Sequence, residues 1–170
     1  MADQTPIEKL QPCLLDRLSD DEPDQKLESR ALRVISHSKY RRGVLRDLEW
    51  LFNTSAYLSL PGLESFQMKD YPEASRSVIN YGTRQLCGVT ELDLDRLQEE
   101  LSDAIKFFEP RISARSLTIQ MSKDLNHVTF EVDGEMWANP LPEHLHVKTS
   151  VDLETGQCLL GDAPHGPTTA

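Results

Sequence analysis

The sequence lacks the segments that mark exported and membrane proteins. No stretch approaches the ~20 consecutive apolar residues that a helix needs to span a bilayer. The start, MADQTPIEKL, has neither the basic nor the apolar region of a signal peptide. Aromatic residues make up only 6% of the chain, which argues against a broad surface for stacking sugars or bases. We therefore expect a cytoplasmic protein without direct membrane insertion.

Cysteine, glycine and histidine are too sparse or too scattered to build a cofactor site. The three cysteines (Cys13, Cys87 and Cys158) lie far apart without CxxC spacing, which suits a reducing compartment and no metal site. The eight glycines do not cluster, so no phosphate-binding loop is predicted. His144 and His146 share one face of a predicted strand, but a zinc site needs three or four ligands. The sequence predicts no metal and no cofactor.

Charge is distributed unevenly along the chain. The net charge of -10 opposes binding to nucleic acids and anionic membranes. Residues 1–28 contain eight acidic and three basic residues, whereas residues 29–54 contain six basic and two acidic ones. This pattern indicates a solvated basic helix that pairs internally with the acidic arm, or else a docking face for an acidic protein partner. No aromatic-interleaved basic element supports a nucleic-acid site.

The chain length predicts one domain with short tails. We expect an acidic N-terminal arm at residues 1–28, a single α+β domain at residues 29–160 and a flexible tail at residues 161–170. The arm contains an apolar segment, LLDRL, which is too short to form a stable helix alone. It must therefore dock on the domain or on another chain. Its residues are Leu14, Leu15, Asp16, Arg17 and Leu18.

Two helices are predicted from apolar residues at three- and four-residue steps. The first begins after a Ser38 cap and ends before the residues NTS. Its buried stripe consists of Val44, Leu45, Leu48, Leu51 and Phe52. Trp50 lies off this stripe, either as a rim residue or as a partner contact. The second helix starts at Thr90 or Asp93 and is ended by Pro110. Its stripe consists of Leu94, Leu97, Leu101, Ile105 and Phe108.

Beyond the second helix the apolar period changes from 3.6 to 2. Three strands are predicted at residues 117–121, 128–132 and 145–151, and the segment LETGQCLL adds a turn and a short fourth strand. Helices followed by an antiparallel meander predict an α+β fold, in which N-terminal helices pack against a small, mainly antiparallel C-terminal sheet.

The stretch FFEPRISA joins the second helix to the first strand and permits two interpretations. Glu109 would be a catalytic acid if its apolar neighbours raised its pKa, but Arg111 favours the charged carboxylate and lowers that pKa. A glycosidase also needs a second carboxylate nearby. The candidates lie on strands or loops predicted to be solvated: Asp124, Glu131 and Asp133. No GxSxG motif is present. We therefore predict no catalytic residues and a structural joint at this turn.

The motifs LLDRL, VLRDLEWLFNT, SVINYG, FFEPRI and DLETG occur in the order and spacing typical of the TssE family. Members of this family are baseplate wedge subunits of bacterial type VI secretion, akin to the lysozyme-related wedge protein of contractile phage tails. The resemblance extends from Leu14 to Gly156, and its one departure is LFNT where the family often has LLNT. The lysozyme label reflects a historical similarity, and the family is understood as structural.

The resemblance implies a fold, a location and partners. The fold would be similar to the handshake domain of the sheath subunit, which exchanges strands with its neighbour. The protein would lie in the cytoplasm at the base of the membrane-anchored apparatus, bound to the wedge proteins TssF and TssG, with TssK and the VgrG hub as further contacts. It would nucleate assembly of the TssB–TssC sheath. The alternatives are a peptidoglycan hydrolase of lysozyme type and an unrelated cytoplasmic adaptor.

The resemblance also assigns the family's EPR motif, which is associated with wedge contacts, to Glu109, Pro110 and Arg111. We expect Glu109 and Arg111 to form a partly exposed pair that contributes little to folding and much to assembly. The LLDRL residues and Trp50 complete the predicted partner-binding set.

Two further expectations concern the ends of the domain. For strand pairing with the sheath we expect a free sheet edge at residues 145–153 or 158–160, with Val147 and Val151 as pairing positions. We also expect that deletion of residues 1–24 leaves a folded domain and weakens complex formation.

Overall fold

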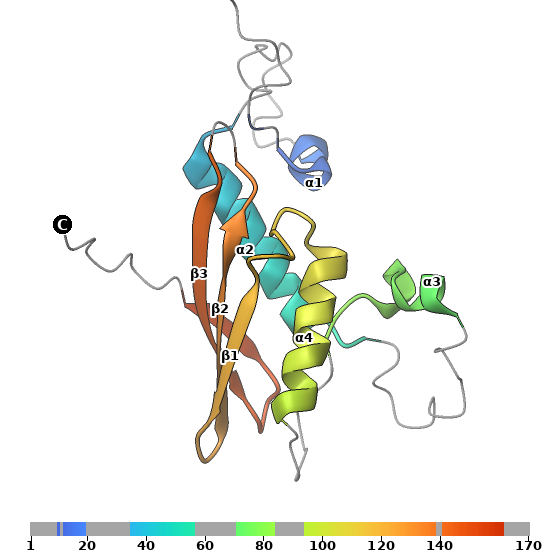
Figure 1. Cartoon of the computed structure of the whole chain (residues 1–170), viewed down its shortest axis with the longest axis vertical. Coiled ribbons are helices and arrows are strands. Elements are labelled where there is room, and N and C mark those ends of the chain that lie inside the picture. Colours follow the sequence, from blue (N-terminus) through green and yellow to red (C-terminus); the bar gives the residue numbers. More distant parts are fainter. Residues whose placement is uncertain are drawn as a thin grey trace, which may run out of the picture.

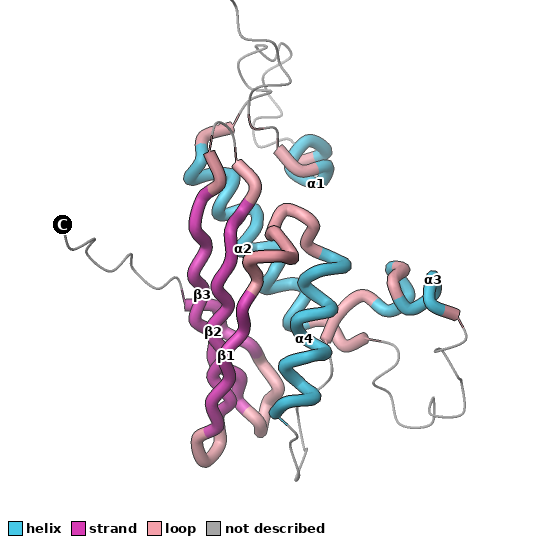
Figure 2. Tube along the Cα trace, in the orientation of Figure 1, coloured by secondary structure: helices cyan, strands magenta, loops and turns pink. Residues whose placement is uncertain are grey.

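The computed structural model describes residues 10, 12–19, 35–56, 71–83, 94–138 and 141–161. The helical elements are α1 (Leu14–Leu18), α2 (His37–Asn53), α3 (Pro72–Ser75), the 3-10 turn η6 (Val78–Asn80) and α4 (Leu94–Phe108). The strands are β1 (Thr118–Lys123), β2 (His127–Met136), β3 (Glu143–Asp152) and β4 (Cys158–Gly161). The helices precede the strands along the chain, as the change of apolar period predicts. Figure 2 shows the helices in cyan and the strands in magenta.

The four strands form one antiparallel meander in the order β1-β2-β3-β4. Alternate residues of β2 and β3 are buried, so one face of the sheet carries the core and the other faces solvent. The two long helices, α2 and α4, contribute most of the remaining core residues and pack beside the sheet (Figure 1). The predicted α+β fold is confirmed, including the short fourth strand.

Helix α2 forms where the apolar stripe was predicted but starts two residues earlier. The cap is Ser36 rather than Ser38, because the Ser36 hydroxyl accepts the Lys39 amide at 3.3 Å while Ser38 is already helical. Val44, Leu48 and Leu51 are almost completely buried. Phe52 meets Phe130 of β2 edge to face, with ring centroids 5.2 Å apart. This stripe therefore fixes α2 on the sheet.

Helix α4 packs through Leu97, Leu101 and Ile105, as predicted. It ends at Phe108, because Pro110 disfavours the helical conformation of Glu109. The predicted caps of this helix, Thr90 and Asp93, lie outside the described residues, as do Cys87 and most of the arm and tail.

The N-terminal segment contributes to the core. Leu10 is buried in the main hydrophobic cluster, and its carbonyl accepts the Ile35 amide at 3.1 Å. Deletion of residues 1–24 would remove this buried side chain and open a cavity. We therefore expect the deletion to lower the stability of the domain, and substitution at exposed positions of the arm tests complex formation without this effect.

The predicted edge positions do not both lie on an edge. Val151 pairs with Val128 of β2 on one side and with Cys158 of β4 on the other, so it is interior to the sheet and that prediction is wrong. Val147 pairs with Val132 of β2, and the ladder to β4 stops one residue away at Lys148. The first predicted edge, residues 145–153, is covered because β4 pairs with residues 148–151 of β3. The alternative, residues 158–160, lies in β4, which is the outer strand on that side of the sheet.

Candidate functional site

The EPR turn, residues 109–111, is tied to the far end of β2. The Trp137 amide donates to the Arg111 carbonyl at 2.7 Å, and the Ser113 amide donates to the Glu135 carbonyl at 2.8 Å. A single bridge also pairs Ile112 with Met136. The turn thus connects α4 to both β1 and β2, which agrees with the predicted joint.

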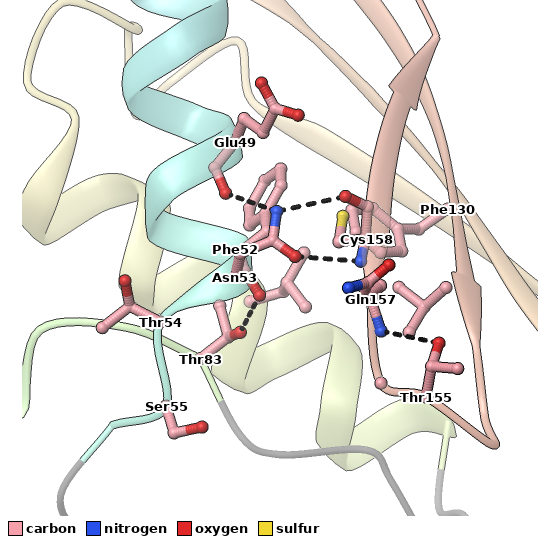
Figure 3. A pocket seen from close by; sticks show the side chains of 13 residues that line it. Glu49, Phe52, Asn53, Thr54, Ser55, Thr83, Phe130, Thr155, Gln157 and Cys158 are labelled. Atoms are coloured by element: carbon pink, nitrogen blue, oxygen red, sulfur yellow. Dashed lines mark hydrogen bonds between the residues drawn. The ribbon is translucent and has the colours of Figure 1, made fainter.

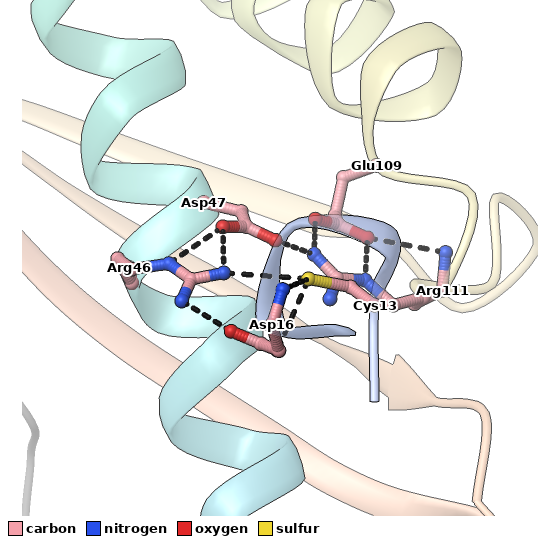
Figure 4. Close-up of polar contacts among 6 residues, drawn as sticks. All are labelled: Cys13, Asp16, Arg46, Asp47, Glu109 and Arg111. Atoms are coloured by element: carbon pink, nitrogen blue, oxygen red, sulfur yellow. Dashed lines mark hydrogen bonds and ion pairs between the residues drawn. The ribbon is translucent and has the colours of Figure 1, made fainter. Parts of the chain in front are cut away.

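Five charged side chains form one network that links this turn to α2 and α1 (Figure 4). We call Asp16, Arg46, Asp47, Glu109 and Arg111 the charge network. Both carboxylate oxygens of Glu109 accept from Arg111, one of them from Nε at 2.5 Å. Arg111 Nη2 also donates to Asp47 at 2.6 Å. Asp47 accepts from Arg46 at 2.8 Å, and Arg46 donates to Asp16 at 2.5 Å.

Burial makes the Glu109 end of the network a structural contact. The Glu109 side chain is 4% exposed and that of Arg111 is 20% exposed. Burial lowers the pKa of Arg111, but the hydrogen bonds and charges of Glu109 and Asp47 raise it by a larger amount. The net shift is upward, so the guanidinium stays charged. The expected pairing of Glu109 with Arg111 is confirmed, but the expectation that the pair is partly exposed is wrong for Glu109, which is buried. Within the triplet Arg111 is half-buried and Pro110 is exposed.

This geometry does not suit acid catalysis at Glu109. Both of its oxygens accept hydrogen bonds from the Arg111 guanidinium, so neither is directed toward a substrate. The nearest second carboxylate in the network, Asp47, binds the same guanidinium. Two described cavities, of about 510 and 400 Å³, are lined by other residues. The arrangement is that of an internal brace between elements.

Helix α1 docks through polar atoms and displays its leucines. The Cys13 thiol donates to Asp16 at 3.0 Å and also accepts from Arg46. Partial burial raises the pKa of Asp16, but the contacts with Cys13 and Arg46 together lower it by a larger amount, so the net shift is downward. The three leucines point away from the domain: Leu14, Leu15 and Leu18 are 70%, 41% and 74% exposed.

Trp50 lies beside this docked segment. It is 48% exposed, and the Arg46 guanidinium lies 5.1 Å from the centre of its ring. The cation that holds α1 in place therefore also contacts the exposed tryptophan. Sequence reasoning selected Trp50 but missed Arg46 and Asp47, although both lie in the quoted motif VLRDLEWLFNT.

The two histidines of β3 both contact a carboxylate on the neighbouring strand, β2. His146 Nδ1 lies 2.9 Å and His144 Nε2 3.5 Å from the same oxygen of Asp133. Among the described residues, no group of three histidine, cysteine or acidic side chains is arranged to hold a metal ion. Within the same part of the chain, none of the helices has both the length and the apolar character to cross a bilayer.

The described residues thus form a small α+β domain braced by a partly buried charge network, with exposed leucines on a docked segment. The family model of baseplate wedge protein gp25 matches residues 38–141. The chain therefore belongs to the baseplate wedge protein gp25 family, which includes TssE of type VI secretion. The matched span contains α2, α4, the EPR turn and the first two strands. No curated protein matches the chain.

Membership gives the chain a coarse function. It is a structural subunit of a phage-tail-like baseplate, and other baseplate proteins are its partners.

Proposed function

We propose that the chain is the TssE-type wedge subunit of a type VI secretion baseplate, which joins TssF and TssG and nucleates the TssB–TssC sheath. The single observation that supports this most is the charge network. It joins three of the motifs on which the resemblance rests: LLDRL through Asp16, VLRDLEWLFNT through Arg46 and Asp47, and FFEPRI through Glu109 and Arg111.

In this proposal the network orients a docking surface rather than forming it. Every charged group in it has a partner within the chain, so a wedge protein would meet what the network holds in place. Those elements are the exposed leucines of α1, the exposed Pro110 and Trp50. Aromatic and apolar side chains of this kind are typical anchors of protein interfaces. TssK and the VgrG hub would lie beyond this wedge contact.

The location follows from the partners. A subunit bound to TssF and TssG would lie in the cytoplasm, at the base of the membrane-anchored apparatus. The sheath would grow from its sheet by strand pairing, as in the handshake domain that the fold is expected to resemble.

The first prediction separates docking from folding. Replacing Leu14, Leu15 and Leu18 together by serine should change the free energy of unfolding by less than ~0.5 kcal/mol, because all three side chains are exposed. Co-purification with TssF and TssG should nevertheless fall sharply, since buried apolar anchors dominate interface energies. Thermal unfolding and pull-down of the purified variant measure the two effects.

Substitution of Leu125 by serine provides a matched control. This leucine is 92% exposed in the β1–β2 turn, remote from the arm, so both measurements should stay at wild-type values. Normal recovery of TssF and TssG by the triple variant would rule out the leucines as a wedge contact. Release of muropeptides from peptidoglycan by the wild-type protein, lost in Glu109→Gln, would instead support the hydrolase alternative.

A further inference from the structure

The two edges of the sheet are not equivalent, and the β4 edge is closed by a side chain of α2. Asn53 Nδ2 donates to the Cys158 carbonyl at 3.1 Å, and Asn53 Oδ1 accepts the Cys158 amide at 3.0 Å (Figure 3). The Asn53 amide also donates to the Glu49 carbonyl at 2.9 Å, which fixes its orientation. The side chain therefore takes the place at Cys158 that a neighbouring strand would occupy.

The register shows that these are edge groups. The Asp152 amide donates to the Gln157 carbonyl at 3.2 Å, and hydrogen-bonded pairs alternate along an antiparallel ladder. Residues 159 and 161 therefore bond to β3, whereas the main-chain groups of Cys158 and Leu160 point outward. The Asn53 side chain bonds both main-chain groups of Cys158, and we call this contact the Asn53 clasp. Leu160 is then the one outward-facing residue of this four-residue strand that the clasp does not cover.

The remaining edge on this side is also engaged. Beyond β4, the residues of β3 from 143 to 147 have no strand beside them among the described residues. The N-terminal half of α2 lies there instead: Arg41 Nη1 donates to the His144 carbonyl at 3.3 Å and is 3.8 Å from Glu143. An added strand on this side of the sheet would have to displace contacts made by α2.

The opposite edge, β1, is open. The Asp124 amide donates to the His127 carbonyl at 2.9 Å, so Ser122, Gln120 and Thr118 bond to β2. The main-chain groups of Ile119, Met121 and Lys123 therefore point away from the sheet. Within the described part of the chain, no residue bonds to them. These three alternate residues span five positions, which is enough to pair with an added strand of ordinary length.

A groove lies at the start of this open edge, between the first residues of β1 and α4. Its volume is about 400 Å³. Residues on one side of α4 line it together with the start of β1: Gln98, Glu99, Ser102, Asp103, Lys106, Leu117, Thr118 and Ile119. The α4 wall carries two acids and one base, and the base, Lys106, lies 3.7 Å from Asp103. The wall therefore has an excess of negative charge that favours basic side chains.

We propose that the sheath pairs with β1 and not with β4, through an extended segment that carries basic side chains at alternate positions. The segment adds as a fifth strand, and its basic side chains face the Glu99 and Asp103 wall of α4. Asn53 keeps the β4 edge closed and thereby makes strand addition one-sided. This inference rests on the proposed role in sheath nucleation, and the β1 edge replaces the edge expected from the sequence.

The test compares proline with alanine at outward positions of each edge. Met121→Pro removes an outward amide without touching the β1–β2 ladder, and Met121→Ala loses the same side chain but keeps the amide. Seeding of TssB–TssC sheath growth should fall about tenfold for Met121→Pro relative to Met121→Ala, since the added strand loses a hydrogen bond and meets the proline ring. The same pair of substitutions at Leu160 should seed equally.

Charge reversal tests the groove. Glu99→Lys with Asp103→Lys should weaken seeding about fivefold at low salt and less at high salt. Glu135→Lys, on the solvent face of the sheet, is the matched control and should leave seeding unchanged. Circular dichroism confirms that each variant is folded.

The outcomes separate this inference from the proposed function. Loss of seeding at Leu160→Pro but not at Met121→Pro would overturn the choice of edge and leave the sheath role standing. Normal seeding by both proline variants would overturn strand addition, while binding to TssF and TssG would still report the wedge role. A wild-type dimer that dissociates in Met121→Pro would show that the edge serves a second copy of this chain, which also overturns the inference.

Discussion

Replacing Glu109 by alanine should lower the free energy of unfolding of the isolated protein by about 3–5 kcal/mol. The substitution leaves the Arg111 guanidinium mostly buried and with only Asp47 as a carboxylate partner. It also leaves a cavity at the end of α4, because the Glu109 side chain is almost completely enclosed. Urea unfolding followed by circular dichroism measures the change.

The control is an ion pair of the same charge type on the surface. Glu100 accepts from Arg96 at 3.1 Å, one helical turn away, and both side chains are substantially exposed. Glu100→Ala should change stability by no more than ~0.5 kcal/mol. A Glu109→Ala variant as stable as Glu100→Ala would contradict the internal brace. Such a result would instead support the role expected from the sequence, in which Glu109 and Arg111 act mainly in assembly.

The effect on assembly should follow from the same brace. Glu109 cannot contact a wedge protein without leaving its buried position. Loss of assembly in a Glu109 variant should therefore scale with the loss of folded protein, or with displacement of the Trp50 and α1 surface that Arg46 and Asp47 hold. In this proposal the EPR motif contributes to recognition indirectly, by positioning the surface formed by α1 and Trp50.

Much of the fold could be predicted because its signals are local. The apolar stripes of α2 and α4 and the alternation in β1, β2 and β3 each depend on residues within a few positions of one another. Pro110 likewise marks the end of α4 through its own ring. These predictions needed no knowledge of which elements touch.

The partners within the site could not be predicted because they depend on long-range packing. Arg111 and Asp47 are 64 positions apart, and Asn53 and Cys158 are 105 positions apart. The sequence places Glu109 two residues from Arg111. It contains no local sign that Asp47 also binds Arg111 or that Glu109 is buried. The error at Val151 has the same origin, since only the return of β4 covers that strand.

The second large effect is expected at Gly82, next to a single parallel bridge that pairs Ser55 with Thr83. We call this contact between the two segments the crossing. Gly82 has a φ of 122°, a conformation that side chains with a Cβ rarely adopt. The crossing is held by the Thr83 amide, which donates to Thr54 at 2.8 Å, and by the Ala56 amide, which donates to Thr83 at 3.0 Å. A Cβ at Gly82 would overlap the Thr54 carbonyl oxygen and lie 2.9 Å from the Ala56 nitrogen. The backbone of one segment would have to move.

Gly82→Ala should therefore destabilise the protein by about 3 kcal/mol or more, through backbone strain and loss of the crossing. Gly43→Ala is the matched control: Gly43 lies inside α2, where an added Cβ would meet only Asp16 at 3.4 Å. That change should be neutral or stabilise by up to ~1 kcal/mol, because alanine favours the helix. Equal stability of the two variants in urea would refute the crossing as a constraint.

The crossing also bears on the closed edge of the sheet, which gives Gly82→Ala a second readout. The Thr83 hydroxyl donates to the Phe52 carbonyl at 3.1 Å, immediately before Asn53 (Figure 3). Displacing Thr83 should therefore shift the end of α2 and loosen the clasp of Asn53 on Cys158. The Cys158 thiol is buried, and burial raises its pKa to about 12, so it should resist alkylation in the wild-type protein. Faster alkylation of Cys158 in Gly82→Ala but not in Gly43→Ala, followed by mass spectrometry under native conditions, would show that the glycine crossing holds the β4 edge closed.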